Sequence, residues 1–219
     1  MAKAIIFDFD GTLVDSEPLY DRQFKKILRE EKVEIDSKDF SAFHGKGIEN
    51  TVKYWKKEYP GKADWDGIGK KFLACFGEIA VIAPLFPGVL ELLETLSQNY
   101  SMPVALCSNS PREVVLRGLR ARKIEGFFPE KVVVCREDFN TPKPAPDAYL
   151  KACSKLGFPP EECVAIEDSL AGTASAKSAG CKVILFNSNG YSKEILASAG
   201  ADFVATSWKQ ITPEVLRKI

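Results

Sequence analysis

The 219-residue sequence contains a single histidine, His44. A Ser-His-Asp or Cys-His catalytic arrangement needs a histidine beside its nucleophile. His44 lies in a segment that we expect to form a separate helical lobe, so neither arrangement can be assembled in the rest of the chain. Any nucleophile, acid or base in that part of the protein must therefore be a carboxylate.

The sequence also lacks an excess of either charge, because 30 Lys and Arg residues offset 30 Asp and Glu residues. Such a chain has no bulk field to attract nucleic acid or an anionic membrane. The first apolar run is cut by Asp8, far short of a signal-peptide core, and no later run approaches the length of a membrane span. We expect a cytoplasmic protein that binds neither nucleic acid nor membranes.

None of the six cysteines forms a C-x-x-C pair, and most of them lie inside apolar runs. This pattern is typical of buried thiols in a reducing compartment rather than of disulfides or a structural zinc site.

Short apolar runs bounded by polar loops recur along the carboxy-terminal two thirds of the chain, and each is typical of a buried strand. The runs are 104–107, 132–135, 163–166, 183–186 and 203–205. Between them, apolar residues recur at the spacing of one helix face, as in Tyr149, Ala152, Cys153 and Leu156. This alternation predicts an α/β fold, with a doubly wound, Rossmann-like parallel sheet.

Residues 16–84 differ because they contain no strand candidate and show three successive apolar helix faces. This segment follows the first predicted strand, 4–9, and ends at 84–88, where two prolines and a glycine stop the last helix. We expect residues 1–15 and 85–219 to form the α/β core, and residues 16–84 to form an inserted all-helical cap domain.

The first predicted strand ends in Asp8-Phe9-Asp10-Gly11-Thr12. Strand alternation sends Asp8 and Asp10 toward the same side, at the edge where ligands bind in open parallel sheets. Gly11 permits a sharp exit from the strand. An ordinary strand-ending turn would explain the aspartates and the glycine without any chemistry.

Three further polar segments should reach the same edge of the sheet: Ser108-Asn109, Lys143 between prolines, and Glu167-Asp168. The first suits anion binding at a helix amino terminus. Each segment alone also has an ordinary explanation, namely a helix cap, a solvated loop lysine and an acidic first helical turn.

Four carboxylates would repel one another at this edge unless a cation joins them: Asp8, Asp10, Glu167 and Asp168. Ligands that are all oxygen select a hard ion. We therefore infer a Mg2+ site.

The ordered set of these four segments resembles the haloacid dehalogenase superfamily of phosphotransferases. The longer string DFDGTLVDSEPLY, the helical insertion after it and the string EDSLAG resemble the sugar-phosphate phosphatase and β-phosphoglucomutase branch. The resemblance implies that Asp8 attacks phosphorus to form an aspartyl-phosphate. It implies that Asp10 protonates the leaving oxygen and then activates water.

The resemblance also implies the residues that bind substrate and metal. Ser108, the backbone at Asn109, and Lys143 would hold the phosphoryl oxygens. Mg2+ would be bound by Asp8, the Asp10 carbonyl and Asp168, with Glu167 in support.

The cap loop 43–47 should contact the leaving group of the ester, through His44 and Lys46. A plain connector between cap helices is the alternative. A small-molecule phosphate ester of the sugar or nucleoside class suits these two side chains. We also expect the protein to be a monomer.

Three other functions share part of this pattern with a phosphatase. A β-phosphoglucomutase-like phosphomutase uses the same core, but Tyr20 stands where that branch has a cap histidine. A dehalogenase shares the nucleophile but needs no acid at position 10. A receiver-like phosphate-binding module is much shorter and has no large cap.

Overall fold

The computed structural model describes residues 2–36, 48–100 and 102–219. Its centre is a six-stranded sheet in the order β3-β2-β1-β4-β5-β6, in which every neighbouring pair is parallel. The strands are β1 (Ala4–Phe7), β2 (Val104–Cys107), β3 (Val133–Val134), β4 (Cys163–Glu167), β5 (Lys182–Phe186) and β6 (Phe203–Ala205). The predicted doubly wound parallel sheet is therefore confirmed.

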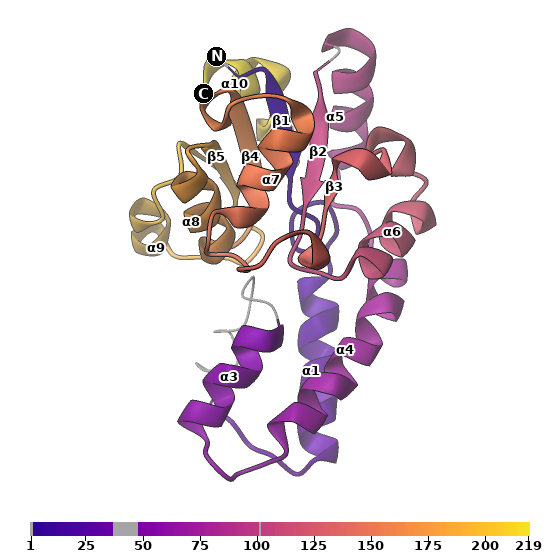
Figure 1. Ribbon diagram of the computed structural model, residues 1–219, viewed down its shortest axis with the longest axis vertical. Helices are drawn as coiled ribbons and strands as arrows, with labels where there is room; N and C mark the ends of the chain where they lie inside the picture. Colours follow the sequence, from indigo (N-terminus) through magenta and orange to yellow (C-terminus); the bar gives the residue numbers. More distant parts are fainter. Residues whose placement is uncertain (1, 37–47, 101) are drawn as a thin grey trace.

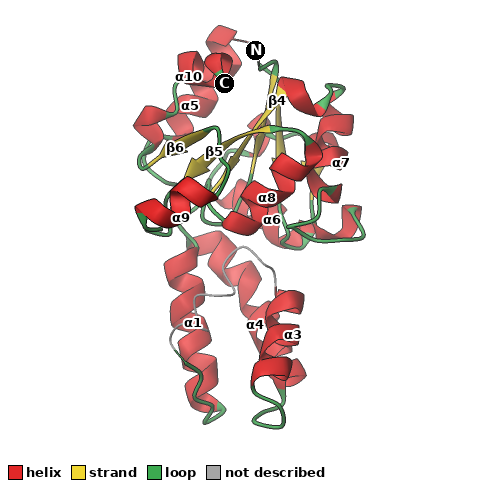
Figure 2. Ribbon diagram, turned by 90° about the vertical axis from the view of Figure 1, so that its left-hand side faces the viewer, coloured by secondary structure: helices red, strands yellow, loops and turns green. Residues whose placement is uncertain are grey.

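Helices cover both faces of the sheet, as Figure 2 shows for α5 and α10 on one side and α7 on the other. The core helices are α5 (Val89–Thr95), α6 (Arg112–Ala121), α7 (Asp147–Leu156), α8 (Leu170–Ala179), α9 (Lys193–Ser198) and α10 (Pro213–Lys218). Strand β1 divides its side chains between two apolar clusters. Ile5 and Phe7 pack with residues of α5, α6 and α10, whereas Ala4 and Ile6 pack with residues of α7 and α8.

Short helical turns join these elements. They are a π-helix at Leu96–Tyr100 and 3-10 turns at Glu125–Phe127, Glu130–Val132, Arg136–Asp138, Pro160–Glu162 and Trp208–Gln210. The run predicted as a strand at 132–135 is shorter in the structure, because Val132 ends one turn and Cys135 caps the next. Only Val133 and Val134 remain to pair with β2.

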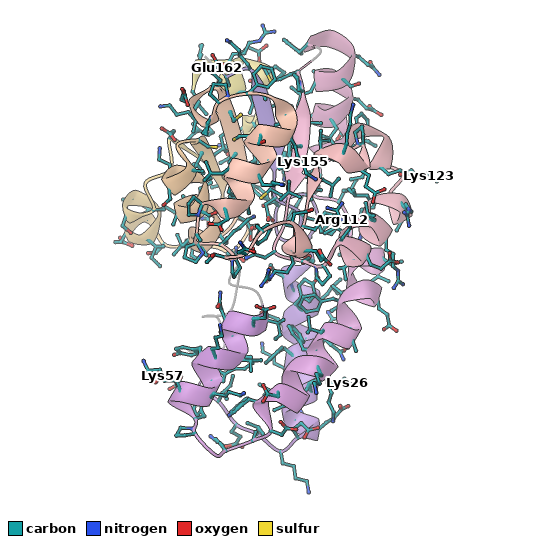
Figure 3. All side chains as sticks on the ribbon, in the orientation of Figure 1. Lys26, Lys57, Arg112, Lys123, Lys155 and Glu162 are labelled. Atoms are coloured by element: carbon teal, nitrogen blue, oxygen red, sulfur yellow. The ribbon has the colours of Figure 1, made fainter. Side chains whose placement is uncertain are left out.

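Helices joined by turns and loops, with no strand, make up the cap in the described part of residues 17–82. Its helices are α1 (Glu17–Glu30), α3 (Ile48–Glu58) and α4 (Trp65–Ile82), and they extend beyond the carboxyl ends of the strands (Figure 1). They enclose an apolar cluster of their own, in which Phe24 contacts Trp55 at 4.7 Å and Phe72 at 4.2 Å between ring centroids. Lysines such as Lys26 and Lys57 point away from this lobe (Figure 3).

Two neighbouring segments connect the core to the cap. Asp15 donates its backbone N–H to the carbonyl of Pro84, and Phe86 donates to the carbonyl of Leu13. The chain thus leaves the core and returns to it at one place. The exact boundaries at 16 and 84 stay a prediction.

Candidate active site

The site lies where the order of the sheet reverses, between β1 and β4. From β1 the chain continues toward β2 and β3 on one side, and it later crosses back to build β4, β5 and β6 on the other. Ligands bind at such a switch point in open α/β sheets, outside the carboxyl ends of the strands. Asp8 directly follows β1, Glu167 is the last residue of β4, and Asp168 follows it.

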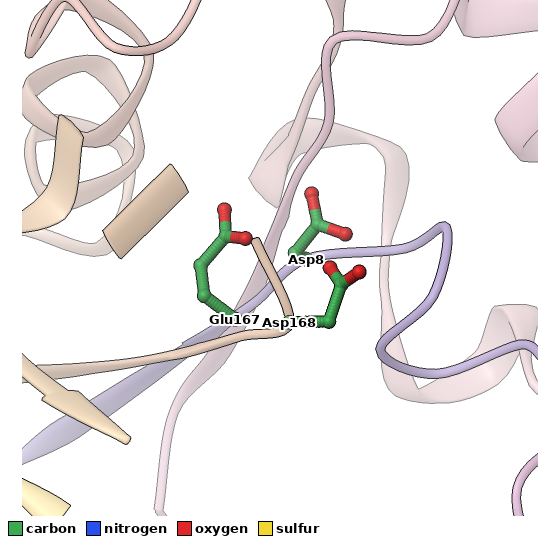
Figure 4. Close-up of side chains that lie close together, drawn as sticks. All are labelled: Asp8, Glu167 and Asp168. Atoms are coloured by element: carbon green, nitrogen blue, oxygen red, sulfur yellow. The ribbon is translucent and has the colours of Figure 1, made fainter. Parts of the chain in front are cut away.

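These three carboxylates form a compact buried group, shown in Figure 4. One ligand oxygen from each of Asp8, Glu167 and Asp168 lies within 4.8 Å of the other two. Burial, followed by the opposing effect of Lys143 and the repulsion of Glu167 and Asp168, leaves the pKa of Asp8 well above its ordinary value. An all-oxygen donor set in such a setting fits a hard divalent cation.

Lys143 crosses this group of carboxylates. Its ammonium donates to Oδ1 of Asp8 at 2.6 Å, to Oε1 of Glu167 at 2.5 Å and to the carbonyl of Cys107 at 2.9 Å. Burial alone would lower the pKa of Lys143, but the charges of Asp8 and Glu167 outweigh burial and raise it. Lys143 therefore stays a cation, and it orients both carboxylates.

Glu167 has further partners within the core. Tyr149 on α7 donates to its Oε1 at 2.6 Å, and Ser169 donates to its Oε2 at 3.2 Å. Ser169 also caps α8 by accepting from the N–H of Gly172 at 3.0 Å. A Cβ on Gly172 would lie 2.0 Å from the Glu167 carboxyl carbon. The glycine in EDSLAG therefore leaves room for this carboxylate.

Asp168 is fixed by two neighbouring loops. Thr12 donates to its Oδ1 at 3.1 Å, and Asn189 donates to its Oδ2 at 2.7 Å. Burial, with repulsion from Glu167 as the next cause, raises the pKa of Asp168 to about 7. Gly11 has a φ of +74°, and a Cβ there would lie 2.3 Å from Oδ2 of Asp168. The sharp exit predicted at Gly11 is thus present and lets the Asp8 loop approach Asp168.

The Asp10 side chain is directed to a different set of partners. Ser16 and Tyr20 donate to its Oδ1 at 2.9 and 3.0 Å, and Ser110 donates to its Oδ2 at 2.7 Å. Burial raises the pKa of Asp10, although these three donors oppose the shift. The Asp10 carboxylate is not one of the three that converge, so its predicted contribution to a metal site rests on its main-chain carbonyl.

The loop after β2 contributes Ser108 and Asn109. Ser108 is buried, and its hydroxyl oxygen accepts from the N–H of Ser110 at 3.0 Å. Asn109 accepts from the N–H of Lys143 at 3.2 Å. This contact joins two segments that the sequence placed at the same edge of the sheet.

A cavity of about 210 Å³ lies between the core loops and the cap. Asp8, Asp10, Ser108, Asn109, Lys143 and Asp168 line its core side, and Tyr20, Ile48, Phe72, Leu73 and Phe76 line its cap side. The two carboxylates predicted to act together therefore face one cavity. His44 and Lys46, the predicted cap contacts, lie outside the described residues.

Sequence reasoning missed Tyr149 and Asn189. Asn189 follows the predicted strand 183–186, so the rule that parallel strands end at one edge could have pointed to it. Tyr149 was assigned only to the apolar face of its helix, and nothing in that spacing indicated that its hydroxyl reaches Glu167.

The helices in the described ranges include none with both the length and the apolar character needed to cross a membrane.

Comparison with known proteins identifies the family. The model of the haloacid dehalogenase-like hydrolases matches residues 2–180. Hexitol phosphatase A of Escherichia coli strain K12 is 34% identical over 216 residues, which cover 96% of this chain and 93% of that protein. SUPPRESSOR OF QUENCHING 1, chloroplastic, of Arabidopsis thaliana is 33% identical over 92% of this chain, but the chain spans only 19% of that protein.

A similar solved structure is CbbY from Rhodobacter sphaeroides in complex with xylulose-(1,5)bisphosphate. It is 26% identical, with a TM-score of 0.78 and coverage of 95% of each chain. The family model spans most of the sequence, and a relative matches it along nearly its whole length. The chain therefore belongs to the haloacid dehalogenase-like hydrolase family, within its sugar-phosphate branch.

Proposed function

We propose that this protein is a Mg2+-dependent phosphatase that hydrolyses a small phosphate monoester of the sugar or nucleoside class. The observation that carries the proposal is that Asp8 and Asp10 line one cavity. Their hydrogen-bond partners differ, because Lys143 donates to Asp8 and three hydroxyl groups donate to Asp10. The name of the relative hexitol phosphatase A supports the same class of reaction.

The carboxylates near Asp8 fit a magnesium ion. Asp8 and Asp168 with the Asp10 carbonyl would hold the ion, and Glu167, already bonded to Lys143, Tyr149 and Ser169, would support it from nearby. Burial and mutual repulsion raise the pKa of both Asp8 and Asp168, and a bound cation would relieve that repulsion. When bound, Mg2+ would neutralise charge between the phosphoryl oxygens and the nucleophile.

Asp8 would be the nucleophile. Its carboxylate attacks phosphorus, the bond to the ester oxygen breaks, and an aspartyl-phosphate forms. Lys143 keeps a positive charge 2.6 Å from Oδ1 of Asp8, which favours the ionised form of that carboxylate. Ser108, the backbone at Asn109 and Lys143 would hold the phosphoryl oxygens during transfer.

Asp10 would act first as an acid and then as a base. A pKa raised by burial allows it to carry the proton that the leaving oxygen needs. The resulting carboxylate would then accept a proton from the water that hydrolyses the aspartyl-phosphate. Ser16, Tyr20 and Ser110 hold this side chain in place for both steps.

The cap would cover the leaving group and exclude bulk water while the phosphoryl group is transferred to Asp8. A cavity of about 210 Å³ accepts a small ester but not a folded macromolecule. We further propose that the protein acts as a monomer in the cytoplasm, which size-exclusion chromatography and localisation in cells would test.

The phosphomutase alternative uses the same core chemistry. In this chain Tyr20 stands at the position of the cap histidine of that branch, and it contacts Asp10 through a phenolic hydroxyl. This contact favours hydrolysis over return of the phosphoryl group to a rotated sugar.

Phosphate release from a panel of phosphorylated metabolites, measured with and without Mg2+, tests the proposal. Asp10→Asn tests whether Asp10 is the general acid. An activated aryl phosphate needs little protonation of its leaving group, whereas a sugar phosphate depends on it. We expect a smaller defect in single-turnover phosphorylation with an aryl phosphate than with a sugar phosphate. Equal defects would exclude Asp10 as the acid, and full activity in excess chelator would exclude the magnesium site.

A further inference from the structure

An ion pair joins the cap to the core across the cavity. Arg136, in the turn Arg136–Asp138 after β3, donates from Nη2 to Oε2 of Glu49 at 3.1 Å. Glu49 lies in the first turn of α3, at the end of that helix nearest the core (Figure 1). Both residues line the cavity that also contains Asp8 and Asp10. None of the roles assigned above uses this pair.

The Arg136 guanidinium is held in position by the core. Its Nη1 donates to the carbonyl of Phe139 at 3.1 Å, and its Cζ lies 5.7 Å from the centre of the Phe139 ring. Its Nη2 is the atom that donates to Glu49 in the cap. A guanidinium held in this way loses little conformational freedom when it binds an anion, and its planar fork matches a carboxylate or a phosphate.

The other cationic side chain in the described cavity wall cannot serve a second anion. The Lys143 ammonium lies 2.6 Å from Oδ1 of the nucleophile Asp8, so it is committed to the phosphoryl group that is transferred. Arg136 is therefore the cation of this cavity wall that is available to an anionic substituent of the leaving group. The Glu49 side chain is 58% exposed, and an ion pair with such a partner contributes little to stability. A competing anion can displace it at low cost.

We propose that Arg136 binds a second anionic group of the substrate, a carboxylate or a phosphate on the leaving group, and that Glu49 occupies this position until the substrate enters. The inference rests on the proposed phosphatase function and narrows its substrate class to monoesters that carry another negative charge. The carboxylate of Glu49 marks the place that this group would take.

Binding to catalytically inert Asp8→Asn protein tests the inference without requiring turnover. Calorimetry would compare a hexitol 6-phosphate with the hexonate 6-phosphate of the same stereochemistry, in which a carboxylate replaces the terminal CH2OH. A second arm would compare a ketohexose 6-phosphate with the corresponding 1,6-bisphosphate. The two arms separate a carboxylate from a phosphate as the second anion.

We expect at least one charged ligand to bind more tightly than its neutral partner. Adding Arg136→Gln should weaken binding of that ligand by about 10- to 100-fold, the range for a hydrogen bond to a charged group, and change the neutral partner by less than about twofold. Adding Glu49→Gln should tighten binding of the charged ligand, because the internal competitor is gone. Lys56→Gln breaks an ion pair within the cap, Lys56 with Asp66, and should leave the preference unchanged.

Equal binding of charged and neutral ligands in both arms would overturn the inference. The inference would also be overturned if Arg136→Gln and Glu49→Gln each weakened binding of the charged ligand and of its neutral partner by the same factor. The ion pair between Arg136 and Glu49 would then act only as a contact between cap and core. The proposed phosphatase function is judged separately, by phosphate release from neutral and charged esters with the unaltered Asp8.

Discussion

The hydroxyl of Tyr20 donates a 3.0 Å hydrogen bond to Oδ1 of Asp10, so the first cap helix directly contacts a core carboxylate. Tyr20 is itself buried in the cap, where its ring lies 4.8 Å from that of Phe76 between centroids. The position of the Asp10 carboxylate is therefore coupled to the packing of the cap. A cap that moves away would withdraw one of the three donors that hold Asp10.

Tyr20→Phe should remove this contact while keeping the ring. A hydrogen bond to a charged group contributes about 1.5–3 kcal/mol, so we expect kcat to fall by about 10- to 100-fold with a sugar phosphate. The effect on an activated aryl phosphate should be smaller, because Asp10 has less to do in protonating that leaving group.

Tyr59→Phe is the matched control. The Tyr59 hydroxyl accepts from the N–H of Asp36 within the cap and does not touch Asp10. Steady-state kinetics on both esters would compare the two variants. Loss of the same size in Tyr59→Phe would show that the cap tolerates no lost hydroxyl, and that Tyr20 has no particular role at Asp10.

Asp8→Asn should abolish turnover and leave the fold intact. The amide is nearly isosteric but is a far weaker nucleophile, and losses on the order of 10⁴-fold are expected for such a group. Phosphate release would be measured on protein whose circular dichroism matches that of the wild type. Retention of most activity by pure variant protein would exclude a covalent intermediate on Asp8.

The edge of the sheet could be predicted because Asp8 and Glu167 come directly after apolar runs. Parallel strands bring their carboxyl ends together, so the pattern of apolar runs followed by acidic residues is sufficient to place these two carboxylates near each other. The same rule could not place the side chain of Asp10. Strand β1 ends at Phe7, and beyond that residue alternation no longer decides the direction of a side chain.

Lys143 shows a second limit of the sequence. The prolines around it predicted a stiff loop, and the family resemblance implied a contact with the phosphoryl oxygens. Neither indicated that its ammonium would lie between Asp8 and Glu167. That position follows from the folded arrangement of two carboxylates and the Cys107 carbonyl. Partners so far apart along the chain leave no periodic signal.

Magnesium should stabilise the protein more as the pH rises. The raised pKa of Asp168, about 7 against an ordinary value of 3.8, means that the folded ion-free protein binds more protons than the unfolded chain between these values. The contribution of this group to the free energy of unfolding therefore falls as pH rises through that window. Above it, the ionised carboxylate is free to bind Mg2+.

Thermal unfolding with and without Mg2+, at about pH 5 and about pH 8, would measure this effect. We expect a larger increase in Tm from Mg2+ at the higher pH, where protons no longer compete. An increase that is the same at both pH values would mean that Asp168 does not titrate in this range or does not bind the ion. Asp168→Asn should reduce the increase and remove most of its pH dependence.

Gly172→Ala tests whether the close approach of α8 to Glu167 is required. In an ordinary helix interior this substitution stabilises a protein by up to about 1 kcal/mol, because alanine has the higher helix propensity. Here the added Cβ would lie 2.0 to 2.1 Å from the carboxyl atoms of Glu167. Something must move, and Glu167 is held by Lys143 and Tyr149. We therefore expect a destabilisation of about 1–3 kcal/mol, the range for overpacking a core.

Gly126→Ala is the matched control, because an added Cβ there meets nothing within 4 Å. Its free energy of unfolding should stay within about 0.5 kcal/mol of the wild type. Urea unfolding and phosphate release would be measured for both variants. Displacement of Glu167 should also disturb Lys143 and, through it, Asp8, so Gly172→Ala should lose activity even where it remains folded. A more stable and fully active Gly172→Ala protein would show that the Glu167 carboxylate can shift without cost, and that the glycine in this segment serves helix packing alone.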